Sequence, residues 1–297
     1  MKNSAMPRWH KVLKMSGKLA RLLCLSFLNS CMEARQGYYL SPDNSNSNPY
    51  HPIPLHSDSI RHAFYINGGY YIGMANYFGF DQVSVGQFSI QRSNNFGIFQ
   101  AYYSADLHLG AYNIADFYNC HYRYSGGWFG SFPIADDTIY HIPDKGKFFG
   151  SYGFSGGINI VKSSGRHEWR ALGIETTVQN EFGNYADFRK NLPDSAANLI
   201  FRNTLTATIG LYTDMIWKSR HERVYGFKFS GGFIINPRNN YSQMITDIKS
   251  TKNIFPLTYF SPCFHASREK VTGFIQFNFG SYADGFQMGF SYKLGKK

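Results

Sequence analysis

The chain has 297 residues; 18% are aromatic, only 16% are charged, and there are 29 glycines and four cysteines. So many aromatic residues with so little charge exclude a disordered chain, and four cysteines are too few for a disulfide scaffold of this length. The longest apolar run, Leu22–Leu28, is too short for a transmembrane helix, which needs about 18 or more apolar residues. The composition therefore favours a single all-β domain.

The net charge of +11 is concentrated at the N-terminus. Residues 1–30 carry six basic side chains and no acidic one, so removing them lowers the net charge to +5. The remaining chain mixes both signs and has no Lys/Arg cluster. Nucleic-acid binding needs basic residues gathered on one face, so no nucleic-acid partner is expected.

Residues 1–30 are typical of a secretory signal peptide. A basic region leads into the apolar block Leu22–Leu28, which is followed by Asn29 and Ser30. Met15 is an alternative start that would give the basic region an ordinary length. An amphipathic N-terminal helix is the competing interpretation, but the abrupt apolar block favours export.

Cys31 directly follows this block and resembles the cysteine of a bacterial lipobox, which is diacylated and becomes the new N-terminus. Asn29 departs from the usual small residue, and an ordinary cleavage site beside an incidental cysteine is the alternative. Residues 31–58 are rich in Pro, Asn and Ser without an apolar period, so we expect a lipidated flexible tether. Nothing in the spacing of Cys120 and Cys263 favours a disulfide between them.

Residues 59–297 predict an antiparallel transmembrane β-barrel of about ten strands. Most expected strands have 11 to 19 residues, whereas soluble strands average about 5–6 and a transmembrane strand needs about 9–11. The expected strands are residues 60–77, 82–93, 96–111, 148–162, 167–181, 199–217, 222–236, 255–267, 270–281 and 285–295.

Apolar and polar residues alternate along most of these strands. In residues 286–294 every even position is apolar, and every odd one is Gln, Gly, Ser or Lys. Large apolar residues on one face and small polar ones on the other suit a narrow barrel in lipid, with the apolar face outward. A soluble barrel would have to pack these aromatics inward. The strands at 82–93 and 255–267 alternate poorly.

Loop lengths give the expected orientation. Outer-membrane barrels have short periplasmic turns and longer extracellular loops. Short connections at 94–95, 163–166, 218–221 and 268–269 alternate here with long ones at 112–147, 182–198 and 237–254. Ten strands then place both ends of the barrel domain on the periplasmic side, which suits an anchor and tether on that side, although a surface-exposed lipid is also compatible with the sequence.

The last strand carries Gln287, Gly289, Tyr292 and Leu294, a pattern that resembles the assembly signal of bacterial outer-membrane proteins. Together, the signal peptide, tether, strands and last strand resemble small outer-membrane β-barrel lipoproteins of Gram-negative bacteria. The resemblance implies that the protein is in the outer membrane, contacts its lipid, and has the barrel-assembly and lipoprotein-processing machineries as partners. It implies no reaction.

Charged residues on the expected inner face predict a polar network in the lumen. Buried charges must be paired, and ten strands enclose little more than the eight whose interior side chains can fill. A network that closes the lumen is therefore favoured, and a selectivity ring in a narrow channel for small solutes is the alternative. The candidates are Glu175, Glu181, Arg202, Asp214 and Lys228.

The long loops offer the remaining candidates. Trp128, Phe129 and Tyr140 would bind an extracellular partner of a non-catalytic, structural or partner-binding barrel. A hydrolase at the outer rim would instead need an acid and a histidine within hydrogen-bonding reach, for which the candidates are Asp136, Asp137 and His141. No nucleophile, metal-ligand or dinucleotide motif is present, so we expect no enzyme, metal or cofactor.

Overall fold

A computed structural model describes most of the chain from Tyr38 onward. Its contacts divide the chain into two units. The described part of the smaller unit is most of a two-stranded sheet, whose strands are β5 (Phe117–Gly127) and β6 (Gly130–Tyr140). The described residues are 38–42, 49–56, 61–75, 81–115, 117–127, 130–140, 144–192, 199–220, 223–235, 257–280 and 282–295.

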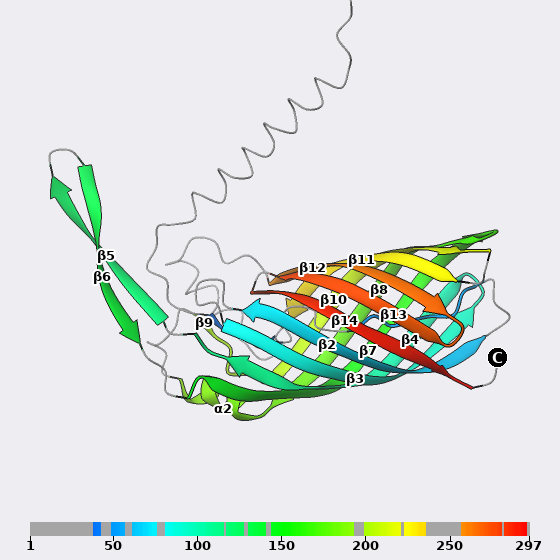
Figure 1. The fold of residues 1–297 in the computed structure, drawn as a ribbon, viewed down its shortest axis with the longest axis horizontal. Coiled ribbons are helices and arrows are strands. Elements are labelled where there is room, and N and C mark those ends of the chain that lie inside the picture. Colours follow the sequence, from blue (N-terminus) through cyan, green and yellow to red (C-terminus); the bar gives the residue numbers. More distant parts are fainter. Residues whose placement is uncertain are drawn as a thin grey trace, which may run out of the picture. The chain divides into compact units, whose positions relative to one another are not determined.

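Ten strands of the larger unit form a closed antiparallel barrel, which confirms the predicted fold (Figure 1). Each strand pairs with the next one along the barrel, and β14 pairs with β2 to close the wall. The strands are β2 (His62–Ala75), β3 (Asp81–Phe96), β4 (Phe99–Asn113), β7 (Gly146–Ser164), β8 (His167–Phe182), β10 (Leu205–Lys218), β11 (Val224–Ile235), β12 (Thr258–Arg268), β13 (Val271–Gly280) and β14 (Ala283–Leu294).

The barrel has an apolar outer face and a polar inner face. Phe154 is 71% exposed and Ile72 52% exposed, whereas Asn67, Ser89 and Gln287 are buried inside. An apolar surface that covers a whole barrel wall far exceeds what a soluble monomer tolerates, but it matches the hydrocarbon of a bilayer. Closure also pairs the backbone groups of every strand within the wall, as a membrane requires.

The two strands that alternate poorly in sequence do alternate in the structure. In β3, Phe88 and Ile90 face outward, but Val83 and Val85 face inward. The apolar residues therefore change face midway along β3, which hides the period. In β12, the buried Tyr259, Ser261, Cys263 and His265 alternate with outward residues that include Phe260 and Phe264.

The two ends of the barrel differ. Short turns join β3–β4, β7–β8, β10–β11 and β12–β13 at one end, which we call the short-turn end. Gly97 and Gly165 supply the left-handed backbone that two of these turns require, with φ of 69° and 58°. The other connections lie at the opposite, long-loop end, and Figure 1 shows β9 and α2 at this end and the last residues of β14 at the other.

Two elements at the long-loop end differ from the expectation, which placed a loop at one and the start of a barrel strand at the other. The helix α2 (Asn184–Asn191) lies within the loop expected at 182–198. Residues 199–200 form β9 (Leu199–Ile200), which pairs in parallel with β1 (Tyr38–Tyr39). The expected strand 199–217 is therefore wrong at its start, because the barrel strand begins only at Leu205. No helix within the described ranges is long and apolar enough to cross a membrane.

The inner wall leaves no room for a side chain at Gly173. A Cβ added there would lie 2.3 Å from the ring of Tyr212. We expect Gly173→Ala to lower the free energy of unfolding by about 1–3 kcal/mol, the usual cost of overpacking. The measurement is urea unfolding of the folded barrel in detergent.

Gly273→Ala is the matched control. A Cβ at Gly273, also on a strand, meets no atom within 4 Å. Equal destabilisation by both substitutions would contradict close packing of Tyr212 on the wall.

Candidate functional site

The lumen contains a segment of the chain itself, residues 49–56, which we call the lumen segment. Tyr50 is 3% exposed and stacks on His265 of β12, with ring centroids 4.2 Å apart. The next residue, His51, packs against Tyr102 of β4 at 4.8 Å. Residues 49–55 are all buried and have no regular secondary structure. The segment is thus held by the inner wall rather than by strand pairing.

The wall binds the lumen segment through its carbonyl groups. Pro52 and Pro54 have no N–H to donate, so the carbonyl oxygens are the main polar groups that the segment offers. Three successive carbonyl oxygens each accept a hydrogen bond from a buried side chain: Pro52 from Gln91 (2.7 Å), Ile53 from Arg170 (2.8 Å) and Pro54 from Gln100 (3.1 Å).

These contacts correct the expectation of a flexible tether over residues 31–58. Its described parts include 38–42 and 49–55, where the residues with a described side chain are buried. The sequence pattern was misleading because a segment without apolar periodicity can still be fixed when a surrounding wall satisfies its backbone. Cys31 and the signal peptide lie outside the described residues.

Arg170 is the centre of the polar network. Its Nη1 lies 2.8 Å from Asp214 Oδ2, its Nε donates to Gln100 at 2.9 Å, and its Nη2 donates to the carbonyl oxygen of Ile53. Asp214 is also 3.0 Å from His265 Nε2. One fully buried guanidinium therefore joins β4, β8 and β10 to the lumen segment.

The inward position of Arg170 was not predicted from the sequence, because β8 is irregular at this residue. The register of β8 against both neighbours shifts next to Arg170, and Ala171 has no partner on either side. Strict alternation would place Arg170 on the same face as Leu172, which is outward. The shift is a β-bulge, which turns Arg170 inward. The sequence does contain a sign of this bulge. Glu168 and Arg170 have even numbers, as do the outward apolar residues of β8 such as Leu172, so the alternation must change face between Arg170 and Leu172.

Glu175 and Lys228 are brought together in the lumen. Lys228 Nζ lies 2.5 Å from Glu175 Oε2, and both side chains are close to buried. The ammonium group also lies 4.4 Å from the ring centroid of Tyr212. Asp214 faces Lys228 across β10 and β11, so three of the five predicted charges share one level of the barrel.

The other two predicted charges lie at the long-loop end. Glu181 forms a buried ion pair with Arg189 of α2. Arg202 is exposed and donates to the carbonyl oxygen of Leu192 at 2.7 Å. The predicted lumen position of Arg202 is wrong because residues 201–204 precede the barrel strand.

An apolar cluster closes the long-loop end, and we call it the cap. Tyr39 and Leu40 are buried there with Tyr112 and Tyr185, whose rings stack at 3.9 Å. Tyr185 donates to the carbonyl oxygen of Leu40 at 3.0 Å. The N-terminal residues of the described chain are therefore part of the closure of this end.

A tyrosine and carboxylate network borders the cap. Tyr112 donates to Asp81 Oδ2 at 2.6 Å, so the 2.7 Å contact between the two hydroxyl groups requires Tyr282 to donate to Tyr112. Burial, with the charge of Asp81, raises the pKa of Tyr282 to about 12. Tyr282 therefore remains a protonated donor at neutral pH.

The expected assembly signal lies in β14. Gln287 faces inward and donates to Gln87 of β3 at 2.6 Å. Gly289 pairs with Gly69, and Tyr292 and Leu294 face outward. Recognition of this strand by assembly machinery remains a prediction.

The residues expected to form a binding or hydrolytic site in the long loops cannot be assembled into a site from the described part of the chain. Trp128, Phe129 and His141 lie outside the described residues, and Asp136, Asp137 and Tyr140 belong to β6. Within the described ranges, no group of three or more His, Cys, Asp or Glu side chains is placed to hold a metal ion. Cys263 is buried as a free thiol.

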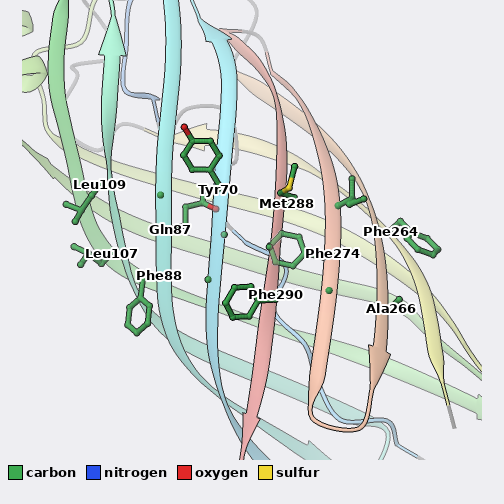
Figure 2. Close-up of a pocket in the computed structure, with 16 residues that line it drawn as sticks. Tyr70, Gln87, Phe88, Leu107, Leu109, Phe264, Ala266, Phe274, Met288 and Phe290 are labelled. Carbon is green, nitrogen blue, oxygen red and sulfur yellow. The ribbon is translucent and has the colours of Figure 1, made fainter.

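A groove of about 890 Å³ lies on the wall rather than in the lumen. Figure 2 shows Tyr70, Phe88, Phe264 and Phe290 among the side chains around it. These four aromatic residues belong to the outer face of the barrel. Acyl chains of the bilayer would fill such a groove, so it is not a solute site.

The closed wall, apolar outside and polar inside, defines the chain as a transmembrane β-barrel of the bacterial outer membrane. No protein-family model matches the chain, and no curated protein matches its sequence.

The fold is similar to that of several solved outer-membrane barrels, three of which follow. An outer membrane channel from Pseudomonas putida F1 is 10% identical, with a TM-score of 0.37, over 82% of this chain and 100% of that one. The transport unit of the autotransporter AIDA-I from Escherichia coli is 11% identical, with a TM-score of 0.35, over 85% and 96%. The NanC porin is 9% identical, with a TM-score of 0.32, over 78% and 100%.

The Lys228–Glu175 ion pair generates a stability prediction. We expect Lys228→Met to lower the free energy of unfolding by about 3 kcal/mol, because it leaves the Glu175 carboxylate without its cation inside the lumen. Adding Glu175→Gln should restore most of that loss. Urea unfolding in detergent, followed by tryptophan fluorescence, measures both.

Asp144, whose side chain is 82% exposed, lies 3.0 Å from Lys147 Nζ and provides the control. Asp144→Asn should change stability by less than about 1 kcal/mol, as for exposed pairs generally. A Lys228→Met effect as small as this would show that the lumen charges are solvated.

Proposed function

We propose that the protein is a non-catalytic outer-membrane β-barrel lipoprotein, closed by its own chain, that acts through its long-loop face. The observation that carries the proposal is the occupied lumen. The cap fills the long-loop end, and the lumen segment binds Gln91, Arg170 and Gln100 below it. A lumen filled in this way leaves no path for a solute. The loops exposed at the long-loop end are therefore the proposed site of action.

The partner-binding surface belongs to the loops in this proposal. The insertion between β4 and β7, which contains β5 and β6, is the largest addition to the barrel. Trp128, Phe129 and Tyr140 lie in it, and aromatic residues are enriched in the buried cores of protein interfaces. Lipidation at Cys31 is the second part of the proposal and would add acyl chains to the membrane contact of the barrel.

A narrow channel for small solutes is the second candidate, and one observation favours it. The lumen segment takes no part in the pairing of the barrel strands, so its departure would leave the wall intact. The inner wall would then present Glu175, Asp214 and Lys228 to a solute. In this alternative the lumen segment is the gate.

Planar-bilayer conductance separates the two candidates. We expect the full chain to give no steady conductance, because the cap and the lumen segment block the path. Deletion of residues 38–56 should produce discrete conductance steps whose ion selectivity changes on Lys228→Met. Deletion of residues 118–138, a segment of similar length with no residue in the cap or lumen segment, is the control and should leave the barrel closed.

Each preparation is first checked for a heat-dependent shift in gel mobility, which reports a folded barrel. Steady conductance of the intact chain would overturn the closed-barrel proposal and establish the channel. A folded deletion variant that still does not conduct would remove the gate interpretation.

A further inference from the structure

The N-terminal part of the barrel unit is fixed at both ends of the lumen. At the long-loop end, Tyr39 pairs with Ile200 and Leu40 accepts a hydrogen bond from Tyr185 of α2. At the short-turn end, the backbone N–H of His56 donates to Glu168 at 2.5 Å, next to the β7–β8 turn.

Between these two points, successive residues of the lumen segment contact wall residues that lie progressively nearer the short-turn end. Tyr50 and His51 meet His265 and Tyr102, which lie in the half of β12 and β4 that is nearer the short turns. The carbonyl oxygens of Pro52, Ile53 and Pro54 are bound next, and Leu55 follows, accepting from Asn95 at 3.4 Å close to the β3–β4 turn. The chain therefore runs down the lumen from the long-loop end to the short-turn end before β2 begins.

The two ends of the barrel domain, at His62 and Leu294, lie together at the short-turn end as expected, but the chain that precedes the domain does not enter from that end. The chain leaves β14 at Leu294 at the short-turn end, whereas it enters the barrel at Tyr38 at the long-loop end. Long loops of outer-membrane barrels face the exterior. We propose that the barrel threads its own N-terminal segment, so that the chain preceding Tyr38 is displayed on the outer surface of the cell.

The inner wall is built to hold an extended peptide in this position. An extended, proline-containing chain makes no internal hydrogen bonds, so its carbonyl groups need external donors wherever water is excluded. Gln91, Gln100 and Arg170 are buried and supply those donors. The outward-facing side chains of the described strands are mainly apolar, so the lumen is the route across the membrane that satisfies this backbone.

The threading also bears on Cys31, a consequence that rests on the proposed lipidation. Six residues separate Cys31 from Tyr38, and the seven steps from one to the other span at most about 25 Å. The hydrocarbon core is about 30 Å thick. Acyl chains on Cys31 would therefore enter the outer leaflet, close to the long-loop end, and not the periplasmic leaflet.

Protease accessibility on intact cells tests the threading. A recognition site for a sequence-specific protease is inserted between Arg35 and Gln36 in the full chain. Matched variants carry the same site in the β7–β8 turn, between Ser164 and Gly165, or in the long loop between Asp194 and Ser195. We expect the first and third sites to be cut at least tenfold faster in intact cells than the turn site, and all three to be cut after lysis.

Two results would overturn the proposal. Cleavage of the long-loop site but not of the site before Gln36 would place the N-terminal chain in the periplasm while leaving the proposed function intact. Cleavage of the turn site alone would show that the short turns face the exterior. The barrel would then have the opposite orientation, and the proposed function of the long-loop face would fail as well. Each variant is checked by its heat-dependent mobility, and an epitope placed before Gln36, read by antibody binding to intact cells, gives the same decision without proteolysis.

Discussion

A buried guanidinium must find partners for all its donors, and in this barrel the lumen is arranged around that requirement. Asp214 neutralises Arg170, Gln100 accepts from its Nε, and the Ile53 carbonyl oxygen accepts from its Nη2. An unpaired charge in such a place would cost several kcal/mol. The interactions that provide partners for the Arg170 guanidinium also hold the lumen segment in place. The same set of contacts therefore closes the lumen and compensates the buried charge of Arg170.

The architecture of the wall was predictable because it depends on a short-range pattern. Phe286, Met288 and Phe290 alternate with small or polar residues, and a period of two along β14 directly gives the outward and inward faces. Loop lengths alternate for an equally local reason. Closure into ten strands followed from the number of such segments, and Glu175 with Lys228 followed from their shared inward parity.

The lumen segment and the cap were not predictable in this way. Pro52 and Pro54 lie in a polar, proline-rich stretch whose composition is that of a linker, and what orders it is a wall made of residues far along the chain. Arg170 was hidden by a one-residue bulge that inverts the parity of β8. Both failures have one cause: long-range contacts decide the position of groups whose local sequence is ambiguous.

The pairing of β14 with β2 also has a topological consequence. Once these strands join, the wall is continuous, and the segment inside can leave only by sliding lengthwise past Arg170 and the stacked ring of His265. A segment already in place when β14 meets β2 needs no such passage. The order of folding events therefore decides how difficult threading is. Strand closure after entry traps the peptide, whereas closure before entry requires the chain to be drawn lengthwise through a narrow, already closed barrel.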